Sequence, residues 1–490
     1  MENIQFDFNN IFSHNIEKRH GVTETDLASM SAAVKKAYRH VVKLISDGPS
    51  RIDLGLEWAQ LPFQHKDEVN AIQKMGDAIA GRYENVISLG IGGSYLGLKA
   101  AQDALCPPYY NEFDKARKDR PRIYFDGNNL DPDTLKSLLN NLKAKKTFVI
   151  VISKSGETTE TKAAFTVIED WLKTNAGDRY GAQVFAITDP NSGTLRKRVS
   201  AEQAKDRMSF RDLPVLKGVG GRFSELNIGL LHMAIVGIDI REVLGGAGSM
   251  ARLCMKQDIF ANPALMYAAL HTILYKKKNK PISILMPFSE TLKSTADWYV
   301  QLLAESLGKK YRRKIVVQKD GRERWENNKA SILNVGRTPI PSRGTNDLHS
   351  IQQNNIEGEN NKAVTFIKVR RFRHEITIPG SGDIMSGRRY SALLSLAQEA
   401  TEWALSKESR PSCTITLPKV SPYYWGGLLF FFEMATAFEG ELLGVNAFDQ
   451  PGVEGYKNYM YYKLNKPGLA KDVERDIIGN PLVKKSKFII

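Results

Sequence analysis

The sequence has few cysteines and no long apolar run, and both shortages narrow the class of protein. Its three cysteines, Cys106, Cys254 and Cys413, are spaced like neither a disulfide framework nor a set of metal ligands. The most apolar stretch, 423–438, is interrupted by Glu433 and falls short of the ~20 residues that a membrane-spanning helix needs. The first residues, MENIQFDFNN, lack the basic and apolar regions of a secretory signal. We therefore expect a cytoplasmic protein without a membrane partner.

Low-complexity tracts and nucleic-acid motifs are also missing. With 42% hydrophobic and 25% charged residues, the composition predicts a soluble globular protein, and 490 residues suggest two or three domains. The net charge of +15 favours anionic ligands, either nucleic acid or phosphorylated small molecules. Basic clusters at 276–280, 309–314 and 368–373 are far apart in the sequence, and no paired Cys/His finger or RNP stretch accompanies them. We interpret them as solvated faces and expect no nucleic-acid binding.

Short runs rich in Val, Ile and Phe recur from about residue 85, and each is followed by a helix-like segment. The first series is NVISLGIGGS, RIYFDG, TFVIVISKSG and AQVFAITD, and a second, looser series is PISILMPFS, KIVVQKDG, AVTFIKVRRF and PSCTITLPKV. Near-continuous apolar strands that alternate with helices indicate parallel sheets covered on both faces. The prediction is an α/β fold with two doubly wound parallel-sheet domains.

The domain organisation follows from where these series lie. Residues 1–60 alternate helical patterns with polar turns and contain no strand-rich run. We expect the first sheet domain at 61–240, the second at 241–440, and a C-terminal helical arm at 441–490. The stretch 226–240, LNIGLLHMAIVGIDI, is predicted to form one apolar helix buried between the two layers of structure.

Ligands of open parallel sheets bind beyond the carboxyl ends of the strands, so the segments after the strands are the candidate sites. The first is GIGGSYLG, 90–97, whose glycines allow backbone N–H groups to approach an anion. Tyr95 stands where a dinucleotide fingerprint requires its third glycine, and no Lys-Ser/Thr of a P-loop follows. The alternative is a tight turn without a ligand, in which Ser94 only caps the next helix.

A second strand end carries SKSGETTET, 153–161, with five hydroxyls, one lysine and one glycine before the helix-like AAFTVIEDWL. One hydroxyl is enough to cap a helix, so this loop has more than capping requires. Hydroxyls and free N–H groups at a helix start suit a phosphate monoester, and we favour this interpretation over a merely polar turn.

Two further motifs carry opposite charges. In GVGGRFSELN, Arg222 lies between glycines and an aromatic residue, and it is either a clamp on carbonyl groups or a fixed cation for a developing oxyanion. STADWYVQLLAESLGKK predicts a helix from about Ser294, on which Gln301 and Glu305 share a face. Leucines beside Glu305 would desolvate its carboxylate, which suits a general base. The alternative is an amphipathic helix with an acid at its boundary.

The remaining candidates lie in turn-rich stretches. His349, in SRGTNDLHS, is either a structural residue or an acid–base catalyst, and Asp347 two residues earlier is a candidate to orient it. FDQPGVEGYK, 448–457, follows the apolar stretch, and its Gln450 and Lys457 either belong to a plain helix start or face a substrate.

Taken together, these motifs resemble the phosphoglucose isomerase family. GIGGS, SKSGETTET, GGRFS, AESLGK, GTNDLHS and FDQPGVEGYK occur in that family's order and approximate spacing, between about residues 85 and 460. The resemblance implies two sugar isomerase (SIS) domains with the site between them. It also implies the interconversion of glucose 6-phosphate and fructose 6-phosphate through a cis-enediol, in glycolysis and gluconeogenesis, with no metal or redox cofactor.

The resemblance also implies residue roles. Glu305 corresponds to the base that moves the proton between C2 and C1, and Arg222 to the cation that stabilises the enediolate. His349 and Lys457 correspond to the pair that opens the sugar ring, with His349 supplied by the other subunit of a homodimer. The residues that match the substrate- and phosphate-binding positions are Gly93, Ser94, Ser153, Lys154, Ser155, Thr158, Thr161, Gln301 and Gln450.

One local departure and two rival functions accompany this resemblance. The stretch after GGRFS, ELNIGLL, carries an acid at Glu225 and is one residue shorter than the family form. A dual phosphoglucose/phosphomannose isomerase would use the same base and phosphate loop, and activity on mannose 6-phosphate distinguishes it. A sugar-phosphate-binding regulator would keep the hydroxyl loop but would not need Glu305, Arg222, His349 and Lys457 together.

Overall fold

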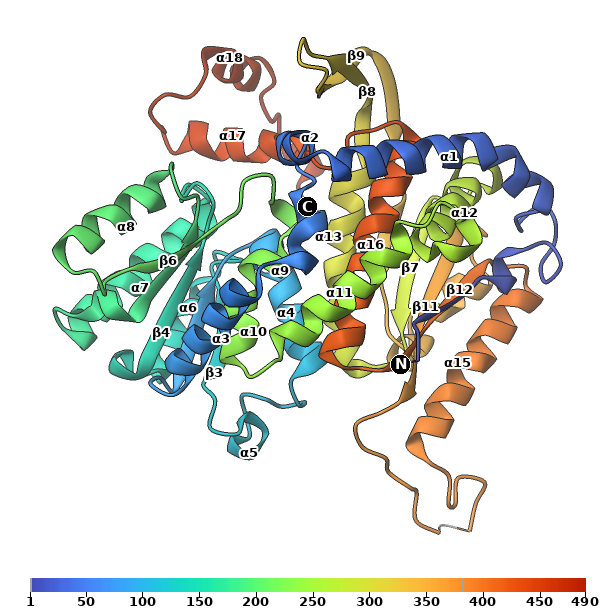
Figure 1. The fold of residues 1–490 in the computed structure, drawn as a ribbon, viewed down its shortest axis with the longest axis horizontal. Helices are drawn as coiled ribbons and strands as arrows, with labels where there is room; N and C mark the ends of the chain where they lie inside the picture. Colours follow the sequence, from blue (N-terminus) through green and yellow to red (C-terminus); the bar gives the residue numbers. More distant parts are fainter. Residues whose placement is uncertain (1, 381) are drawn as a thin grey trace. The chain divides into compact units, whose positions relative to one another are not determined.

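The computed structural model describes residues 2–380 and 382–490. These residues form two compact units that divide after Ala447, and the second unit is Phe448–Ile490. The first unit contains two sheets of five strands each, and the second contains two helices (Figure 1).

The first sheet is parallel throughout, with the spatial order β3-β2-β4-β5-β6. Its strands are β2 (Asn85–Leu89), β3 (Arg122–Asp126), β4 (Thr147–Ile152), β5 (Val184–Thr188) and β6 (Arg211–Pro214). Every residue of β2, β4 and β5 is buried, as expected for strands covered on both faces. The four strands predicted from apolar runs are confirmed, whereas β6, with the sequence RDLP, lacks that signal.

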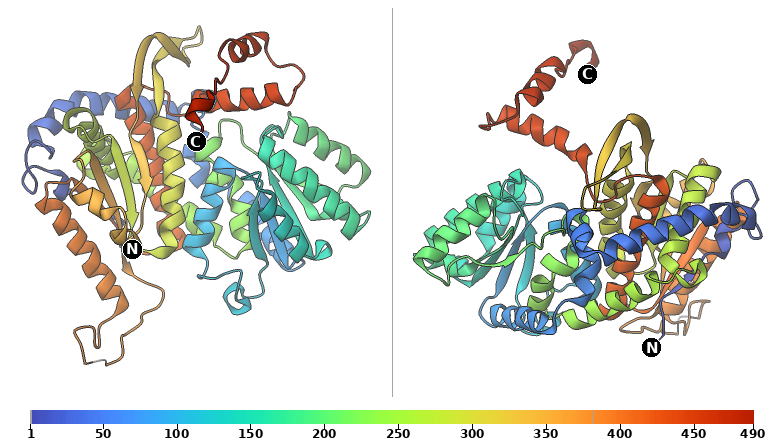
Figure 2. Two further views of the ribbon diagram at one scale, coloured as in Figure 1. Left: turned by 180° about the vertical axis from the view of Figure 1, so that it is seen from behind. Right: turned by 45° about the horizontal axis from the view of Figure 1, so that its top comes forward.

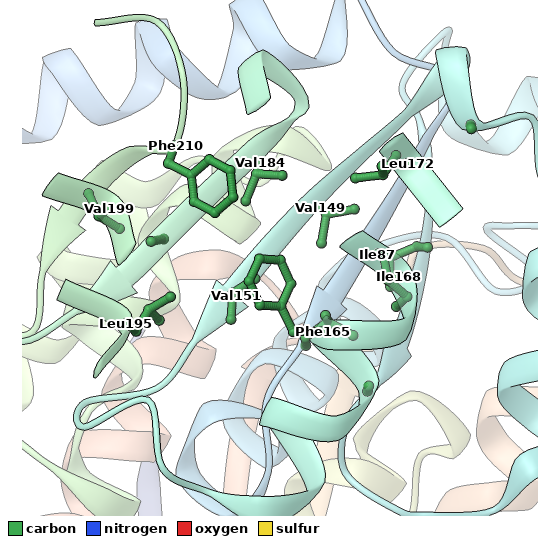
Figure 3. Close-up of a cluster of buried hydrophobic side chains, with 14 residues drawn as sticks. Ile87, Val149, Val151, Phe165, Ile168, Leu172, Val184, Leu195, Val199 and Phe210 are labelled. Atoms are coloured by element: carbon green, nitrogen blue, oxygen red, sulfur yellow. The ribbon is translucent and has the colours of Figure 1, made fainter. Parts of the chain in front are cut away.

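Helices α6 (Pro132–Asn141), α7 (Thr159–Ala176) and α8 (Thr194–Lys205) cover one face of this sheet, and α3 (Lys66–Ala80) and α10 (Leu230–Ile235) lie on the other (Figure 1). Figure 3 shows the core beneath α7, where Phe165 and Ile168 pack toward Val149 and Val151 of β4. Burying each such side chain stabilises the fold by about 1.5–3 kcal/mol. This core fixes the start of α7, and with it the polar loop that follows β4.

The second sheet has the spatial order β1-β12-β11-β7-β10, in which the edge strand β1 is antiparallel and the other strands are parallel. Its strands are β1 (Gln5–Asp7), β7 (Ile282–Pro287), β10 (Thr338–Pro341), β11 (Lys362–Arg371) and β12 (Ser412–Lys419). β1 lies in the N-terminal region, where the sequence indicates no strand-rich run, because three residues are too few to show a period. The sequence runs predicted as β7, β11 and β12 are confirmed.

One predicted member of the second sheet is wrong. KIVVQKDG contributes to β8 (Lys309–Val317), which pairs with β9 (Glu323–Val335) in a separate antiparallel hairpin. Exposed lysines and arginines occur along β8, so the strand is unsuited to a position covered on both faces. The hairpin stands away from the second sheet (Figures 1 and 2).

The predicted single helix over 226–240 is also wrong, although the stretch is mostly buried. It consists of α9 (Glu225–Ile228) and α10, followed by a turn before α11 (Ile240–Cys254). Gly237 makes that turn with φ of +84°, a left-handed conformation that glycine adopts without strain. The break places α10 under the first sheet and frees α11 to pack against α16 (Pro422–Leu443).

Helix α16 contains the most apolar stretch and is buried along nearly its whole length. It packs against α11, α12 (Pro263–Lys278) and α13 (Lys293–Leu307), which explains why it is apolar on all sides. Within the described part of the chain, no helix is long and apolar enough to span a membrane.

The remaining helices frame this core. They are α1 (Glu24–Ser46), α2 (Gly48–Asp53), α4 (Leu96–Leu105), α5 (Asp114–Arg117), α14 (Gln352–Ile356), α15 (Tyr390–Lys407), and, in the second unit, α17 (Glu454–Lys463) and α18 (Lys471–Gly479). The predicted α/β class, with parallel sheets, N-terminal helices and a C-terminal helical arm, is confirmed. The domain boundaries after residues 60, 240 and 440 stay predictions.

Candidate active site

Two glycine-rich loops meet at the carboxyl end of the first sheet. A Cβ atom at Gly93 would lie 1.9 Å from the carbonyl oxygen of Gly221, so only glycine allows the GIGGS loop to reach the GGRFS loop. Gly92 has φ of +60°, and a Cβ there would lie 2.9 Å from Nε2 of Gln301 on α13. The glycines at these positions therefore bring both loops against the helix of Glu305.

Arg222 is buried in the GGRFS loop, with 1% of its surface exposed. Its guanidinium donates to Ser306 Oγ (2.8 Å), to the carbonyl oxygen of Ala447 (2.6 Å) and to Glu305 Oε2 (3.2 Å). The contact with Ala447 is a clamp on a carbonyl group, as one of the two alternatives predicts. The other alternative, a fixed cation for a developing oxyanion, stays a prediction. A guanidinium held at several points has little freedom to move when charge develops nearby.

Glu305 and Gln301 share a face of α13, as their spacing predicts. Gln301 Nε2 donates to Glu305 Oε1 over 3.1 Å, so each carboxylate oxygen of Glu305 has a donor. The Glu305 side chain is 26% exposed, which leaves it reachable from solvent. Gln301 Oε1 is buried, and no described residue supplies it with a hydrogen bond. The predicted role of Gln301 in binding the substrate stays a prediction.

The SKSGETTET loop connects β4 to α7 and uses some of its own hydroxyls. Ser153 Oγ accepts from the backbone N–H of Gly156 (3.0 Å), and Ser155 Oγ accepts from that of Glu157 (3.1 Å). Both serine hydroxyls keep their own protons to donate. Gly156 has φ of +76°, and a Cβ there would lie 2.4 Å from the backbone nitrogen of Leu195, so the loop path requires glycine.

The other hydroxyls of this loop differ in burial. Thr161 is buried and donates its hydroxyl proton to the carbonyl oxygen of Gly127 (3.2 Å), so it remains only an acceptor. Thr158 precedes α7, and its side chain makes no capping bond. Lys154 is exposed. The loop therefore presents donors from Lys154, Thr158 and the two serines at the start of a helix, whereas Thr161 supports the loop from beneath.

His349 lies in a short 3-10 turn, Asn346–His349, after β10, and it is exposed. The nearby Asp347 accepts from Ser342 Oγ (3.2 Å) and from the backbone N–H of Arg343 (2.8 Å). Asp347 therefore holds its own loop together, and its contacts with described residues do not include the His349 ring.

Gln450 and Lys457 belong to the second unit. Gln450 precedes a 3-10 turn, Pro451–Val453, and Lys457 lies on α17. Partial burial would lower the pKa of Lys457, but the Glu454 carboxylate, 3.0 Å from its Nζ, outweighs this and raises the pKa. Their part in the site stays a prediction.

Two further contacts near the charged pair involve Ser306 and Trp298, and neither residue is among those predicted from the sequence. Ser306 follows Glu305 directly and bonds Arg222, and Trp298 lies two helical turns before Glu305 and donates to Glu225 (2.6 Å). The one sequence signal that could have identified Ser306 and Trp298 is their position on the same predicted helix as Glu305. Among the described residues, no three His, Cys, Asp or Glu side chains gather in a way that could hold a metal ion.

Comparisons with known proteins identify the family of the chain. The family model of phosphoglucose isomerase matches residues 43–471. A glucose-6-phosphate isomerase from Carboxydothermus hydrogenoformans is 34% identical over 495 residues, covering 99% of both chains. One from Symbiobacterium thermophilum is 36% identical over 420 residues, covering 84% of this chain and 87% of that protein.

Solved structures share the fold. A hypothetical protein from Thermus thermophilus superposes with a TM-score of 0.78 at 29% identity, covering 94% of this chain and 100% of that one. A glucose-6-phosphate isomerase from Chlamydia trachomatis has a TM-score of 0.74 at 22% identity, covering 93% and 89%, and supports the fold alone. Sequence and fold together define an aldose–ketose isomerase built on two five-stranded sheets, one parallel and one mostly parallel. The chain belongs to the phosphoglucose isomerase family.

Proposed function

We propose that this chain interconverts glucose 6-phosphate and fructose 6-phosphate, with Glu305 as the base. Family membership supports the reaction. The observation that carries the residue assignment is the pair of Glu305 and Arg222, a reachable carboxylate 3.2 Å from a buried guanidinium. An aldose–ketose isomerase needs these two groups: one to take a proton from carbon, and one to stabilise the resulting oxyanion.

The proton transfer needs a single carboxylate. Glu305 removes the proton on C2 of the open-chain aldose, the C2–H electron pair forms the C1=C2 double bond, and the carbonyl electrons move to O1. The intermediate is a cis-enediol. The hydroxyl proton on O2 passes to O1, the same carboxyl group returns its proton to C1, and the electron pair left on O2 forms the ketone C2=O2 bond. Gln301 bonds one oxygen of Glu305, and this bond aims the carboxylate.

Arg222 supplies the positive charge for the enediolate. Two of its partners, Ser306 and the Ala447 carbonyl, are neutral oxygen atoms, so they fix the guanidinium without cancelling its charge. A preorganised donor of this kind lowers the barrier by about 3–4 kcal/mol, or about 10²- to 10³-fold in rate.

The substrate phosphate binds at the start of α7, in the loop from Ser153 to Thr161, with Ser94 and Gly93 in the adjoining glycine loop. Three features support this: hydroxyl protons free to donate, the exposed Lys154 and the N-terminal N–H groups of α7. A phosphate held there anchors the sugar while the reaction occurs at the other end of the molecule.

Ring opening is assigned to His349 and Lys457, with Gln450 as a hydrogen-bonding partner of the sugar. Opening moves a proton between O5 and O1, and an imidazole suits this step because its ring nitrogens can accept and donate a proton. The exposure of His349 supports its contribution to a second copy of the chain, in a homodimer. We propose the cytoplasm as the compartment.

The direct test follows conversion of fructose 6-phosphate to glucose 6-phosphate by the purified protein with EDTA present. We expect the wild type to turn over and Glu305→Gln to lose about 10²- to 10⁴-fold in kcat. Glu68→Gln, at an exposed glutamate of α3, is the matched control and keeps wild-type activity. A wild-type protein that binds fructose 6-phosphate without converting it would leave only the sugar-phosphate-binding role.

A further inference from the structure

Glu225 is a fully buried acid at the centre of the candidate site's framework. It begins α9, three residues after Arg222, and none of its surface is exposed. Its Oε1 accepts the indole N–H of Trp298 over 2.6 Å. Its Oε2 is buried too, and it has no hydrogen-bond partner among the described residues. A carboxylate with one oxygen left unpaired in this way is far less stable than a protonated carboxyl group.

Three elements of the site touch this one side chain. The GGRFS loop leads into Glu225, and α13 supplies Trp298, seven residues before Glu305. Helix α4, which follows the GIGGS loop, approaches so closely that a Cβ at Gly97 would lie 2.0 Å from Glu225 Cγ. Glu225 therefore links three helices: α9, which it begins, α4, which follows the GIGGS loop, and α13, which carries Glu305.

The charged group that faces Glu225 from α16 is a second acid, Glu433, which is also buried. α13 presents an indole N–H, and α4 presents the backbone at Gly97. Burial raises the pKa of Glu225 to about 8. Burial, together with the charge of Glu225, raises the pKa of Glu433 well above its ordinary range. At neutral pH the pair therefore carries protons.

We propose that Glu225 is a positioning residue for the isomerisation, which in its neutral, protonated form holds the loop of Arg222 to the helix of Glu305 through Trp298. This inference rests on the proposed function. The neutral form matters because a negative charge three residues from Arg222 would weaken the positive potential that Arg222 provides at Glu305. Ionisation of Glu225 would also place an uncompensated charge between the elements that it joins.

The expected pH dependence follows from the sign of the pKa shift. A carboxyl with a raised pKa keeps its proton in the folded state after the unfolded chain has lost it, so stability falls as pH rises from the ordinary value of 4.5 to about 8. Above that value this group contributes no further change. The value of kcat, which depends on the neutral form, falls as pH rises through about 8.

The variants Glu225→Gln and Glu225→Ala separate the neutral charge of Glu225 from its contact with Trp298. Glutamine keeps the Trp298 acceptor and the neutral charge, so we expect this variant to keep at least about half of the wild-type kcat and to lose the decline of kcat near pH 8. Alanine removes the acceptor and leaves a cavity, and we expect kcat to fall by about 10- to 100-fold with KM changed less than about threefold. Infrared spectra of the wild type should show a protonated-carboxyl carbonyl band that the Gln variant reduces.

Trp298→Phe should reproduce the loss of kcat seen with Ala, and Trp425→Phe is its matched control. Trp425 is also buried, and its indole N–H donates to Thr295 Oγ1 of α13 (3.2 Å) rather than to Glu225. We expect Trp425→Phe to lower the Tm and to leave kcat within about twofold of wild type.

Two outcomes would overturn the proposal. One is a Glu225→Gln variant as slow as the Ala variant, which would show that the ionised form is needed. The other is an Ala variant with wild-type kcat and pH profile, which would make Glu225 purely structural. Failure of the proposed function can be distinguished from failure of this inference. If the wild type has no isomerase activity, the infrared band and the pH dependence of Tm still report the protonation of Glu225, because neither measurement needs turnover.

Discussion

At the scale of single residues, the geometry of Arg222 explains why a guanidinium is required. Three acceptors lie in different directions around it, on Ser306, Glu305 and the Ala447 carbonyl. The planar guanidinium, with its five N–H groups, can donate to all three acceptors at once. The ammonium group of a lysine is a compact charge and cannot reach acceptors that lie in such different directions. The identity of this side chain therefore matters more than its charge.

The substitution Arg222→Lys should therefore keep the positive charge but no longer hold it in a fixed position beside Glu305. We expect kcat to fall by about 10²- to 10³-fold, with a much smaller change in KM, because the enediolate forms only along the reaction path. The control is Arg337→Lys, at another buried arginine, which pairs with Glu439 through two bonds of 2.8 and 2.7 Å. That control should lower the Tm rather than kcat. Similar losses of kcat in both variants would contradict the special role of Arg222.

At the scale of elements, the close approach of two loops sets the position of the charged pair. The GIGGS loop follows β2, and the GGRFS loop precedes α9. The two loops meet where Gly93 faces the Gly221 carbonyl. Helix α13 then packs beside both, through Gln301 at Gly92. A side chain at the meeting point would have to push backbone away from backbone, which no rotamer change can relieve.

Gly93→Ala tests this contact, and Gly220→Ala is its matched control two residues from Arg222. A Cβ at Gly93 would lie 1.9 Å from Gly221 O, whereas one at Gly220 meets no atom within 4 Å, and Gly220 has an extended φ of 172°. We expect Gly93→Ala to lower kcat/KM by at least about tenfold and Gly220→Ala to stay within about threefold of wild type. Equal activities would contradict the idea that the loop contact positions the site.

At the scale of the whole molecule, the central proposal is a dimer that shares its sites. His349 is exposed on its own chain, and it is assigned to the site of a second copy. If this is right, a hybrid of one Glu305→Gln chain and one His349→Ala chain has one site that carries both changes and one site that carries neither.

Co-expression of these two inactive variants should therefore restore about half of the wild-type activity per hybrid dimer, since one site in two is intact. The measurement is kcat of the hybrid purified by two different affinity tags. Mixing the separately purified homodimers without exchange of subunits is the control. Hybrids that form and stay inactive would place His349 in the site of its own chain.

Part of this architecture could be predicted from the sequence because its signals are local. The apolar runs of β2 and β4, and the four-residue spacing of Gln301 and Glu305, report structure that each segment forms on its own. The sequence of β10, TPIP, does not indicate a strand, because its strand character comes from pairing with β7. The pairs Arg222–Glu305 and Glu225–Trp298 join residues 83 and 73 positions apart, and only the folded chain reveals them.

Proton transfer by Glu305 is tested most directly by exchange of the transferred hydrogen in deuterated water. The wild type and Glu305→Gln are compared at equal occupancy by fructose 6-phosphate. If Glu305 moves the hydrogen as a proton, the wild type should incorporate deuterium at C1 of fructose 6-phosphate and C2 of glucose 6-phosphate during turnover. The variant should lose incorporation and conversion together, by about 10²- to 10⁴-fold. Incorporation and conversion by the variant at the wild-type rates would contradict proton transfer by Glu305.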